Sequence, residues 1–378
     1  INQKNQNVHL SKRSKVISAH RHEVEEKEIT KVLEVRRRDA AEVQVVADSS
    51  IWGQFDLLLA DLDGVVYEGA RAIPNTVPAI NSLQAAKVQI GYVTNNSSRK
   101  PETIAEQLRG FGLNTEAQSV ISSGLTAVEL LAEKIPAGGK VLVVGGEGLR
   151  YFVSSAGFKI VQSSEDKPVA VVQGFAPDVA WKDLAEASFA IQNGAIWIAT
   201  NSDWTLPQER GIAPGNGTLV SAVHTAVGQF PIVAGKPEPA IFNTALNVFK
   251  PKAALFVGDR LETDVLGAKR AGVTSAIVLT GIATKKDLLA AKPEERPEYI
   301  LETLSDLLTD YPILKQTKRG WRCGDADVEL LGDKVLVVEG DPRSIDALRA
   351  ACSVIWNAEK HIHFLDVQKE LFSKEGIE

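Results

Sequence analysis

Short apolar runs recur along residues 55–280, and most of them lead directly into Gly, Asp or Asn. They read FDLLLADLDG, VQIGYVTNN, KVLVVGG, PVAVVQGF, AIWIATN, ALFVGD and TSAIVLTG. Segments with helical spacing separate them, as at residues 78–87 and 101–111. Buried strands that alternate with helices are typical of βαβ units. The sequence therefore predicts an α/β fold with a Rossmann-like parallel-sheet core.

The two ends of the chain lack this alternation. Residues 1–50 are rich in charges of both signs, so we expect a solvated N-terminal extension, with a helix near residues 24–45. The segment YPILKQTKRGW reads as a linker, and residues 322–378 follow it as a small C-terminal α/β appendage. In that appendage we expect strands near residues 328–331 and 335–339 and a helix near residues 344–356.

Composition narrows the class of protein. The chain has 378 residues, enough for two or three domains, and its 42 Lys and Arg are outnumbered by 48 Asp and Glu. This acidic balance disfavours nucleic-acid binding, which needs a basic face. Two Cys residues and no CxxC pair suggest a reducing, cytoplasmic location. The N-terminus is polar and no apolar run approaches the ~18–20 residues of a membrane span, so we expect neither a secretory signal nor a membrane contact.

Two carboxylates follow the first apolar run. Asp61 and Asp63 are two positions apart at a strand end, so both can project into one site, and Gly64 allows the chain to turn away. Adjacent carboxylates repel each other unless they share a proton or a cation. The pair therefore predicts a hard metal ion such as Mg²⁺, although a strand-end turn rich in Asp explains a lone DxDG about as well.

Three further polar clusters follow other strands of the predicted sheet. Thr94, Asn95 and Asn96 offer a hydroxyl, amides and backbone N–H groups before a helix, which suits an anion, although a helix N-cap alone would look the same. Lys236 brings a cation. The last cluster contributes the carboxylates Asp259 and Asp264. Open parallel sheets bind ligands at the carboxyl ends of their strands, so these clusters can share one site.

The four clusters follow one another along the chain in an order that resembles the motif order of the haloacid dehalogenase-like phosphatases. The segments DLDGVVY, VTNNSSR, GKP and GDRLETDV are similar to the branch that includes NagD and the phosphoglycolate, pyridoxal and glycerol-phosphate phosphatases, which carry a class IIA cap. The resemblance covers residues 55–308, about two thirds of the chain. It implies hydrolysis of a phosphate monoester without fixing which one.

The resemblance also implies a role for each motif residue. Asp61 would be the nucleophile that forms an aspartyl-phosphate, and Asp63 the general acid and base. Thr94 and the backbone of Asn95 would hold phosphoryl oxygens, while Lys236 would offset their negative charge. Mg²⁺ would be held by Asp61, the carbonyl of Asp63 and Asp259, with Asp264 in support.

About 140 residues separate the second cluster from the third, too many for a loop. We expect an inserted α/β cap at residues 136–230, so that residues 51–135 and 231–312 form the catalytic core. A segment of the cap resembles the substrate-facing loop of this branch, and its candidate specificity residues are Asn201, Asp203, Trp204 and Pro207. Trp204 could equally be a packing anchor. A homodimer through the cap is a further expectation.

The preferred interpretation is a cytoplasmic Mg²⁺-dependent phosphatase of glycerol 3-phosphate or 2-phosphoglycolate. A broader phosphatase of nucleotides or pyridoxal phosphate is an alternative, as is a regulatory binding protein with an incidental phosphatase core. The glycine-rich turn at residues 145–148 lacks the spacing of a dinucleotide fingerprint. His361 and His363 lack an obvious third metal ligand.

Overall fold

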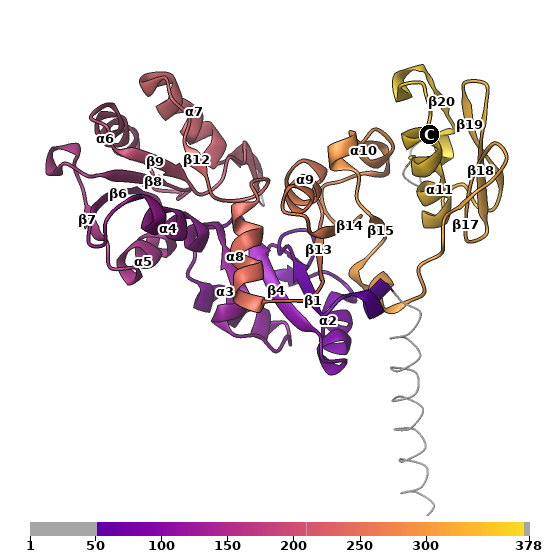
Figure 1. The fold of residues 1–378 in the computed structure, drawn as a ribbon, viewed down its shortest axis with the longest axis horizontal. Helices are drawn as coiled ribbons and strands as arrows, with labels where there is room; N and C mark the ends of the chain where they lie inside the picture. Colours follow the sequence, from indigo (N-terminus) through magenta and orange to yellow (C-terminus); the bar gives the residue numbers. More distant parts are fainter. Residues whose placement is uncertain (1–50, 209, 374–378) are drawn as a thin grey trace, which may run out of the picture.

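A computed structural model describes residues 51–208 and 210–373, which form three modules arranged side by side (Figure 1). A six-stranded sheet forms the core, a five-stranded sheet forms the cap and a second five-stranded sheet forms the C-terminal module. The α/β fold with a parallel core sheet is confirmed. The predicted helix near residues 24–45 lies outside the described residues.

The core sheet has the strand order β15-β14-β13-β1-β4-β5, with every neighbouring pair parallel. Its strands are β1 (Leu57–Ala60), β4 (Gln89–Thr94), β5 (Val120–Ser122), β13 (Ala254–Gly258), β14 (Thr274–Val278) and β15 (Tyr299–Leu301). The helices of the core are α2 (Thr76–Ala85), α3 (Pro101–Gly110), α8 (Ala240–Phe249), α9 (Leu266–Arg270) and α10 (Lys285–Leu289). A short hairpin of β2 (Tyr67–Glu68) and β3 (Arg71–Ala72) follows β1.

Strand β1 lies at the middle of the core, and this explains its unbroken apolar sequence. Leu58 and Ala60 join the apolar cluster that contains the buried side chains of α2 and α3. Leu57 and Leu59 join the cluster on the other face, with α8 and α9. A strand buried on both faces carries apolar residues at every position, as parallel sheets commonly do.

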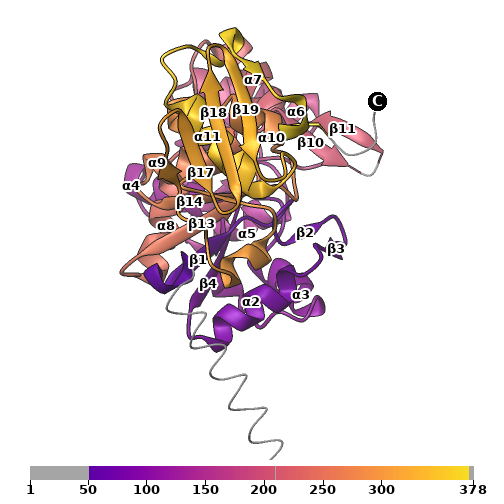
Figure 2. The same cartoon turned by 90° about the vertical axis from the view of Figure 1, so that its right-hand side faces the viewer.

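The cap sheet has the strand order β12-β9-β8-β6-β7 and is also parallel. Its strands are β6 (Lys140–Val144), β7 (Lys159–Val161), β8 (Ala170–Gln173), β9 (Ile196–Ala199) and β12 (Ile232–Val233). Side chains of α4 (Ser123–Lys134) and α5 (Glu147–Ser155) form one apolar cluster with it, and those of α6 (Trp181–Gln192) and α7 (Asn216–Val227) form another. The hairpin of β10 (Thr205–Gln208) and β11 (Gly211–Pro214) projects from the cap (Figure 2).

The C-terminal module pairs a sheet with one long helix. Its strands are β16 (Lys315–Gln316), β17 (Gly320–Cys323), β18 (Ala326–Leu331), β19 (Lys334–Glu339) and β20 (Asp366–Val367), in that order. The helix α11 (Ile345–Trp356) belongs to an apolar cluster shared with α10 and with core residues next to β13. The Trp356 Nε1–H donates to the Leu288 carbonyl at 3.1 Å, which fixes the module to the core.

Two predicted boundaries differ from the structure. Strand β12 pairs with β9 of the cap, so the cap sheet extends beyond residue 230, because a short strand completes the edge of that sheet. Strand β16 pairs with β17, so the C-terminal sheet begins at Lys315 rather than at residue 322. The polar sequence KQ carries no apolar alternation that would mark it as a strand.

Candidate active site

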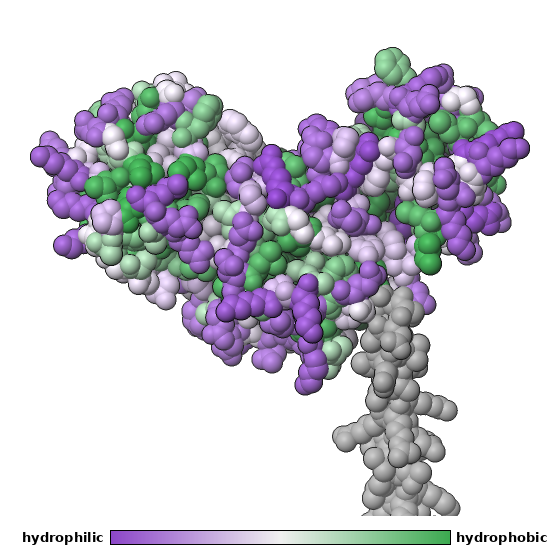
Figure 3. All heavy atoms as spheres, viewed as in Figure 1, coloured by the Kyte–Doolittle hydropathy of each residue, from purple (hydrophilic) through white to green (hydrophobic). Residues whose placement is uncertain are grey.

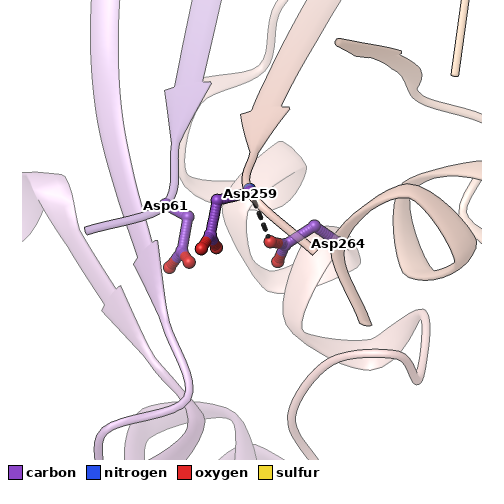
Figure 4. Close-up of side chains that lie close together, drawn as sticks. All are labelled: Asp61, Asp259 and Asp264. Atoms are coloured by element: carbon purple, nitrogen blue, oxygen red, sulfur yellow. Dashed lines mark hydrogen bonds between the residues drawn. The ribbon is translucent and has the colours of Figure 1, made fainter. Parts of the chain in front are cut away.

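Three carboxyl groups meet where β1 and β13 end (Figure 4). Asp61 follows β1 and Asp259 follows β13, its neighbour in the sheet. Asp264 lies in the π-helical turn η4 (Leu261–Val265), where its Oδ2 accepts the backbone N–H of Asp259 at 3.0 Å. One oxygen of each carboxylate lies within 4.8 Å of the others.

Lys236 lies against this triad as its counter-charge. Its Nζ is 2.8 Å from Asp61 Oδ1 and 2.7 Å from Asp264 Oδ1, and only 4% of the side chain is exposed. Burial disfavours the charged ammonium, yet Asp264 and Asp61 together raise the pKa of Lys236 above its ordinary value. Lys236 therefore stays charged within the protein interior.

One lysine does not neutralise three buried carboxyl groups. Burial raises the pKa of Asp61 well above its usual range, and the charges of Asp264 and Asp259 raise it further. Burial, together with Asp264, raises the pKa of Asp259 to about 7. Asp259 Oδ1 is buried without a hydrogen-bond partner among the described residues. An oxygen-only donor set with an unpaired buried oxygen fits a hard divalent cation.

The backbone around Asp259 is shaped for that carboxylate. Its Oδ2 accepts the N–H of Ile282 at 2.8 Å, and its carbonyl accepts the N–H of Ala283 at 2.9 Å. A Cβ at Gly64, which has φ +83°, or at Gly281 would collide with the Asp259 carboxylate. Gly64 thus serves two needs, the left-handed turn after Asp63 and close approach to the neighbouring strand.

The Thr94 loop is held by its own side chains. Thr94 is buried, and its Oγ1 accepts the backbone N–H of Asn96 at 3.1 Å. Asn96 Oδ1 in turn accepts the N–H and the hydroxyl of Ser98, each at 3.0 Å. The Asn95 carbonyl accepts the Ser123 hydroxyl at 2.7 Å. The loop is therefore preorganised before any ligand binds.

Asp63 is exposed and does not belong to the carboxylate triad. The protein atoms around it still raise the pKa of its carboxyl group by desolvation, which outweighs the positive charges of Lys236, Arg99 and Arg260. A carboxyl group with a raised pKa can hold a proton that it then donates. The predicted acid–base role of Asp63 is compatible with this setting and stays a prediction.

The cap loop after β9 reaches the core. Asp203 accepts the Asn95 Nδ2–H at 3.1 Å and 3.2 Å, and Asn201 Nδ2 donates to the Asn95 carbonyl at 2.8 Å. Trp204 is 66% exposed, and Pro207 lies in β10. Asn201 and Asp203 thus have protein partners, and the contacts of these four residues with a substrate stay predictions.

Two features of the core–cap junction had not been predicted from the sequence. The Ser97 hydroxyl donates a hydrogen bond to the Thr200 hydroxyl at 3.0 Å in the buried junction. The glycine-rich turn packs there too, since a Cβ at Gly148 would collide with the backbone of Arg99. The sequence indicates that Ser97 and Thr200 each lie near the end of a strand. It does not indicate that they contact each other, because they are far apart in the chain.

Comparison with known families agrees with this geometry. Residues 58–159 match the profile described as haloacid dehalogenase-like hydrolase, and residues 233–307 match a second profile, HAD-hydrolase-like. The D-glycerol 3-phosphate phosphatase of Mycobacterium tuberculosis is 39% identical over 320 residues, which cover 82% of this chain and 88% of that protein. The chain belongs to the haloacid dehalogenase-like hydrolases. Within them it is a phosphoric monoester hydrolase of the NagD-like branch.

Other relatives match a smaller share of this hydrolase. The acid sugar phosphatase of Staphylococcus saprophyticus is 34% identical over 254 residues, 67% of this chain and 96% of that protein. A p-nitrophenyl phosphatase structure from Archaeoglobus fulgidus has a TM-score of 0.63 at 29% identity and covers 67% of this chain and 98% of its own.

The similarity to one solved structure covers a larger share of this chain. A glycerol phosphate phosphatase from Mycobacterium tuberculosis, in complex with magnesium, has a TM-score of 0.77 at 38% identity and covers 85% of this chain and 96% of its own. That share exceeds what residues 51–312 occupy. The similarity therefore continues beyond the core and the cap of this hydrolase.

Two weaker sequence features remain outside the site. His361 and His363 stack with ring centroids 4.7 Å apart, but they do not belong to the triad, the one group of three potential metal ligands found in residues 51–208 and 210–373. None of the helices in that part of the chain is both long and apolar enough to cross a lipid bilayer.

Proposed function

We propose that this hydrolase removes the phosphoryl group of glycerol 3-phosphate in a Mg²⁺-dependent reaction through an aspartyl-phosphate. The choice of glycerol 3-phosphate as substrate rests on the extent of the similarity to the glycerol phosphate phosphatase, which covers 85% of this chain. The acid sugar and p-nitrophenyl phosphatases match only 67%. 2-Phosphoglycolate is the second candidate, because it is a small phosphate ester of similar length.

Each residue of the site has its own role in the reaction. An Asp61 oxygen attacks phosphorus, the bond from phosphorus to the ester oxygen breaks, and Asp63 gives that oxygen its proton. Asp63 then takes a proton from water, whose oxygen bonds to phosphorus as the Asp61–phosphorus bond breaks. Thr94 and the Asn95 backbone hold phosphoryl oxygens, and Lys236 offsets their charge.

Asp61, Asp259 and the carbonyl of Asp63 would hold Mg²⁺, with Asp264 in support, since its Oδ1 lies 2.7 Å from Lys236 Nζ and its Oδ2 accepts the N–H of Asp259. When bound, the ion would neutralise charge on the phosphoryl oxygens and favour the ionised form of Asp61, whose pKa burial raises. The ionised Asp61 is the form that attacks phosphorus.

The first experiment measures phosphate release from a panel of esters with Mg²⁺ and with EDTA. The panel contains glycerol 3-phosphate, 2-phosphoglycolate, pyridoxal phosphate, a nucleoside monophosphate and p-nitrophenyl phosphate. We expect the highest kcat/KM for glycerol 3-phosphate and no turnover in EDTA. A higher value for another ester would overturn the substrate, and full activity in EDTA would overturn the metal site.

The second experiment tests the acid–base role of Asp63. We expect Asp63→Asn to lower kcat roughly 100-fold or more for glycerol 3-phosphate, whose alkoxide leaving group needs a proton. The rate of aspartyl-phosphate formation from p-nitrophenyl phosphate, followed as the nitrophenolate burst, should fall much less because nitrophenolate leaves unprotonated. Equal losses in both rates would contradict this role. Asp61→Asn serves as the control, since it should abolish the burst.

A further inference from the structure

Asn95 lies where three chain segments meet. It follows β4 of the core, and its side chain contacts Lys236, which follows β12, and Asp203, which follows β9 of the cap. Residue numbers 95, 203 and 236 are far apart, so these contacts exist only in the folded chain. Gly235 makes room for them, because a Cβ there would collide with Asn95 Oδ1.

Every polar atom of the Asn95 carboxamide has a protein partner. Its Oδ1 accepts the Lys236 backbone N–H at 2.8 Å, and its Nδ2 donates to the Lys236 carbonyl at 3.1 Å. Nδ2 also donates to both carboxylate oxygens of Asp203, at 3.1 Å and 3.2 Å. An amide has two donor hydrogens and one acceptor oxygen, so all of its bonding capacity except an oxygen lone pair is in use.

We infer that Asn95 is a positioning residue, whose side chain fixes the Lys236 backbone and the Asp203 carboxylate as one hydrogen-bonded unit. The inference deepens the proposed function and rests on it for its kinetic test. Both backbone groups of Lys236 are held, so the ammonium remains between Asp61 and Asp264. Because Asp203 belongs to the cap, the cap loop and the catalytic lysine take their places together.

This role differs from the binding of substrate by the Asn95 side chain. A residue that recognised only the glycerol part would raise KM for glycerol 3-phosphate and leave p-nitrophenyl phosphate unaffected. A displaced lysine would instead lower kcat for every ester, because small misplacements of a charged group in an active site are costly. The split between kcat and KM therefore separates the two roles.

The experiment exchanges the two partners. Asn95→Asp places a carboxylate against Asp203 and removes both donors, so we expect kcat for both esters to fall roughly 10- to 100-fold, the range of a lost hydrogen bond to a charged group. Asp203→Asn keeps an acceptor for Asn95, so we expect it to lose less activity than Asn95→Asp, and it serves as the second single variant of the cycle. The double variant rebuilds the hydrogen bond between residues 95 and 203 with donor and acceptor reversed. Its kcat should be roughly 5-fold or more above that of Asn95→Asp.

Hydrogen–deuterium exchange gives a readout independent of activity. We expect Asn95→Asp to speed exchange in two loops, residues 200–204 and residues 234–237, and the double variant to slow it again. Asn193→Asp makes the same change at an exposed position at the end of α6 and should alter neither exchange nor rate. If Asn95→Asp fails to fold, Asn95→Ser, which removes the same bonds without adding charge, is expected to speed exchange in both loops.

The outcomes separate the inference from the proposed function. A double variant no better than Asn95→Asp in rate and exchange overturns the inference, and so does a loss confined to KM for glycerol 3-phosphate. Unchanged exchange in Asn95→Ser does the same. If the parent chain releases no phosphate from any ester while exchange follows the expected pattern, the proposed function fails and the junction stands.

Discussion

Asp61, Asp259 and Asp264 bring three carboxyl groups together opposite one lysine. Their charges repel each other, and burial removes the water that would screen them. Without a cation, one way to relieve the repulsion is to bind a proton. At the scale of single residues, the site therefore couples metal binding to protonation.

The pKa of Asp259 predicts how pH affects the stability of the metal-free protein. It lies at about 7 in the folded chain, against about 3.9 in an unfolded one. A raised folded pKa contributes stability that is fully present below about pH 4 and is lost as the pH rises toward 7. Relative to Asp259→Asn, the parent in EDTA should lose melting temperature between pH 4.5 and pH 7.5.

Mg²⁺ is expected to reverse this loss at pH 7.5 in the parent but not in Asp259→Asn, because the ion favours the ionised carboxylate. Differential scanning fluorimetry at several pH values, with EDTA or Mg²⁺, makes the comparison. Parallel pH curves for the two proteins in EDTA would show that Asp259 does not titrate in this range.

Asp61 and Asp259 could be placed together from sequence alone, because both follow apolar runs of a parallel sheet. Their supporting contacts could not. The N–H of Ile282 reaches Asp259 only because the chain after β14 returns to the end of β13, and nothing in the letters GIAT signals this. Likewise, the sequence indicated a phosphate-binding role for the Asn95 backbone, which stays a prediction, but it did not indicate the contacts of the Asn95 side chain with Asp203 and Lys236.

At the scale of elements, too, the position of helix α11 could be predicted from the sequence and its contacts could not. The helix expected near residues 344–356 is observed at Ile345–Trp356, with Ser344 as its N-cap. The strand β17 was missed, because GWRC alternates weakly and Cys323 is its one buried residue. No pattern in the sequence indicated a partner for Arg349. This residue of the helix is buried, and its Nε–H donates to the Ile300 carbonyl at 2.9 Å.

Arg349 joins the C-terminal module to the core. It pairs with Asp346 at 2.7 Å and lies 4.2 Å from the ring centre of Tyr311. Arg349 is buried while the Asp346 side chain is 25% exposed. Arg349→Met leaves the buried Ile300 carbonyl without its donor, so it should lower the free energy of unfolding by about 2 kcal/mol. Urea unfolding measures the change, with the exposed Arg343→Met as control. A loss no larger than that of the control would contradict the prediction.

At the scale of the whole molecule, the cap exposes apolar surface (Figure 3). Trp181 is 80% exposed and Phe189 is 48% exposed, and their spacing of eight places them on one face of α6. The predicted homodimer through the cap would bury this face. Sedimentation should then give a dimer for the parent and a monomer for Trp181→Glu.

Phe364→Glu is the matched control for this prediction. Phe364 is 73% exposed on the C-terminal module, so its replacement should leave the dimer intact. A parent chain that sediments as a monomer at micromolar concentration would rule out the cap dimer.

The insertion of the cap also has a consequence for how the chain is made. Strand β1 lies between β4 and β13, yet about 190 residues separate β1 from β13. At roughly 5–20 residues per second, a ribosome takes on the order of ten to forty seconds to synthesise that stretch. During that time one edge of an entirely apolar strand has no partner, and such edges favour aggregation. Slow codons within the cap would prolong this exposure, so the yield of folded enzyme should depend on how quickly the cap is translated.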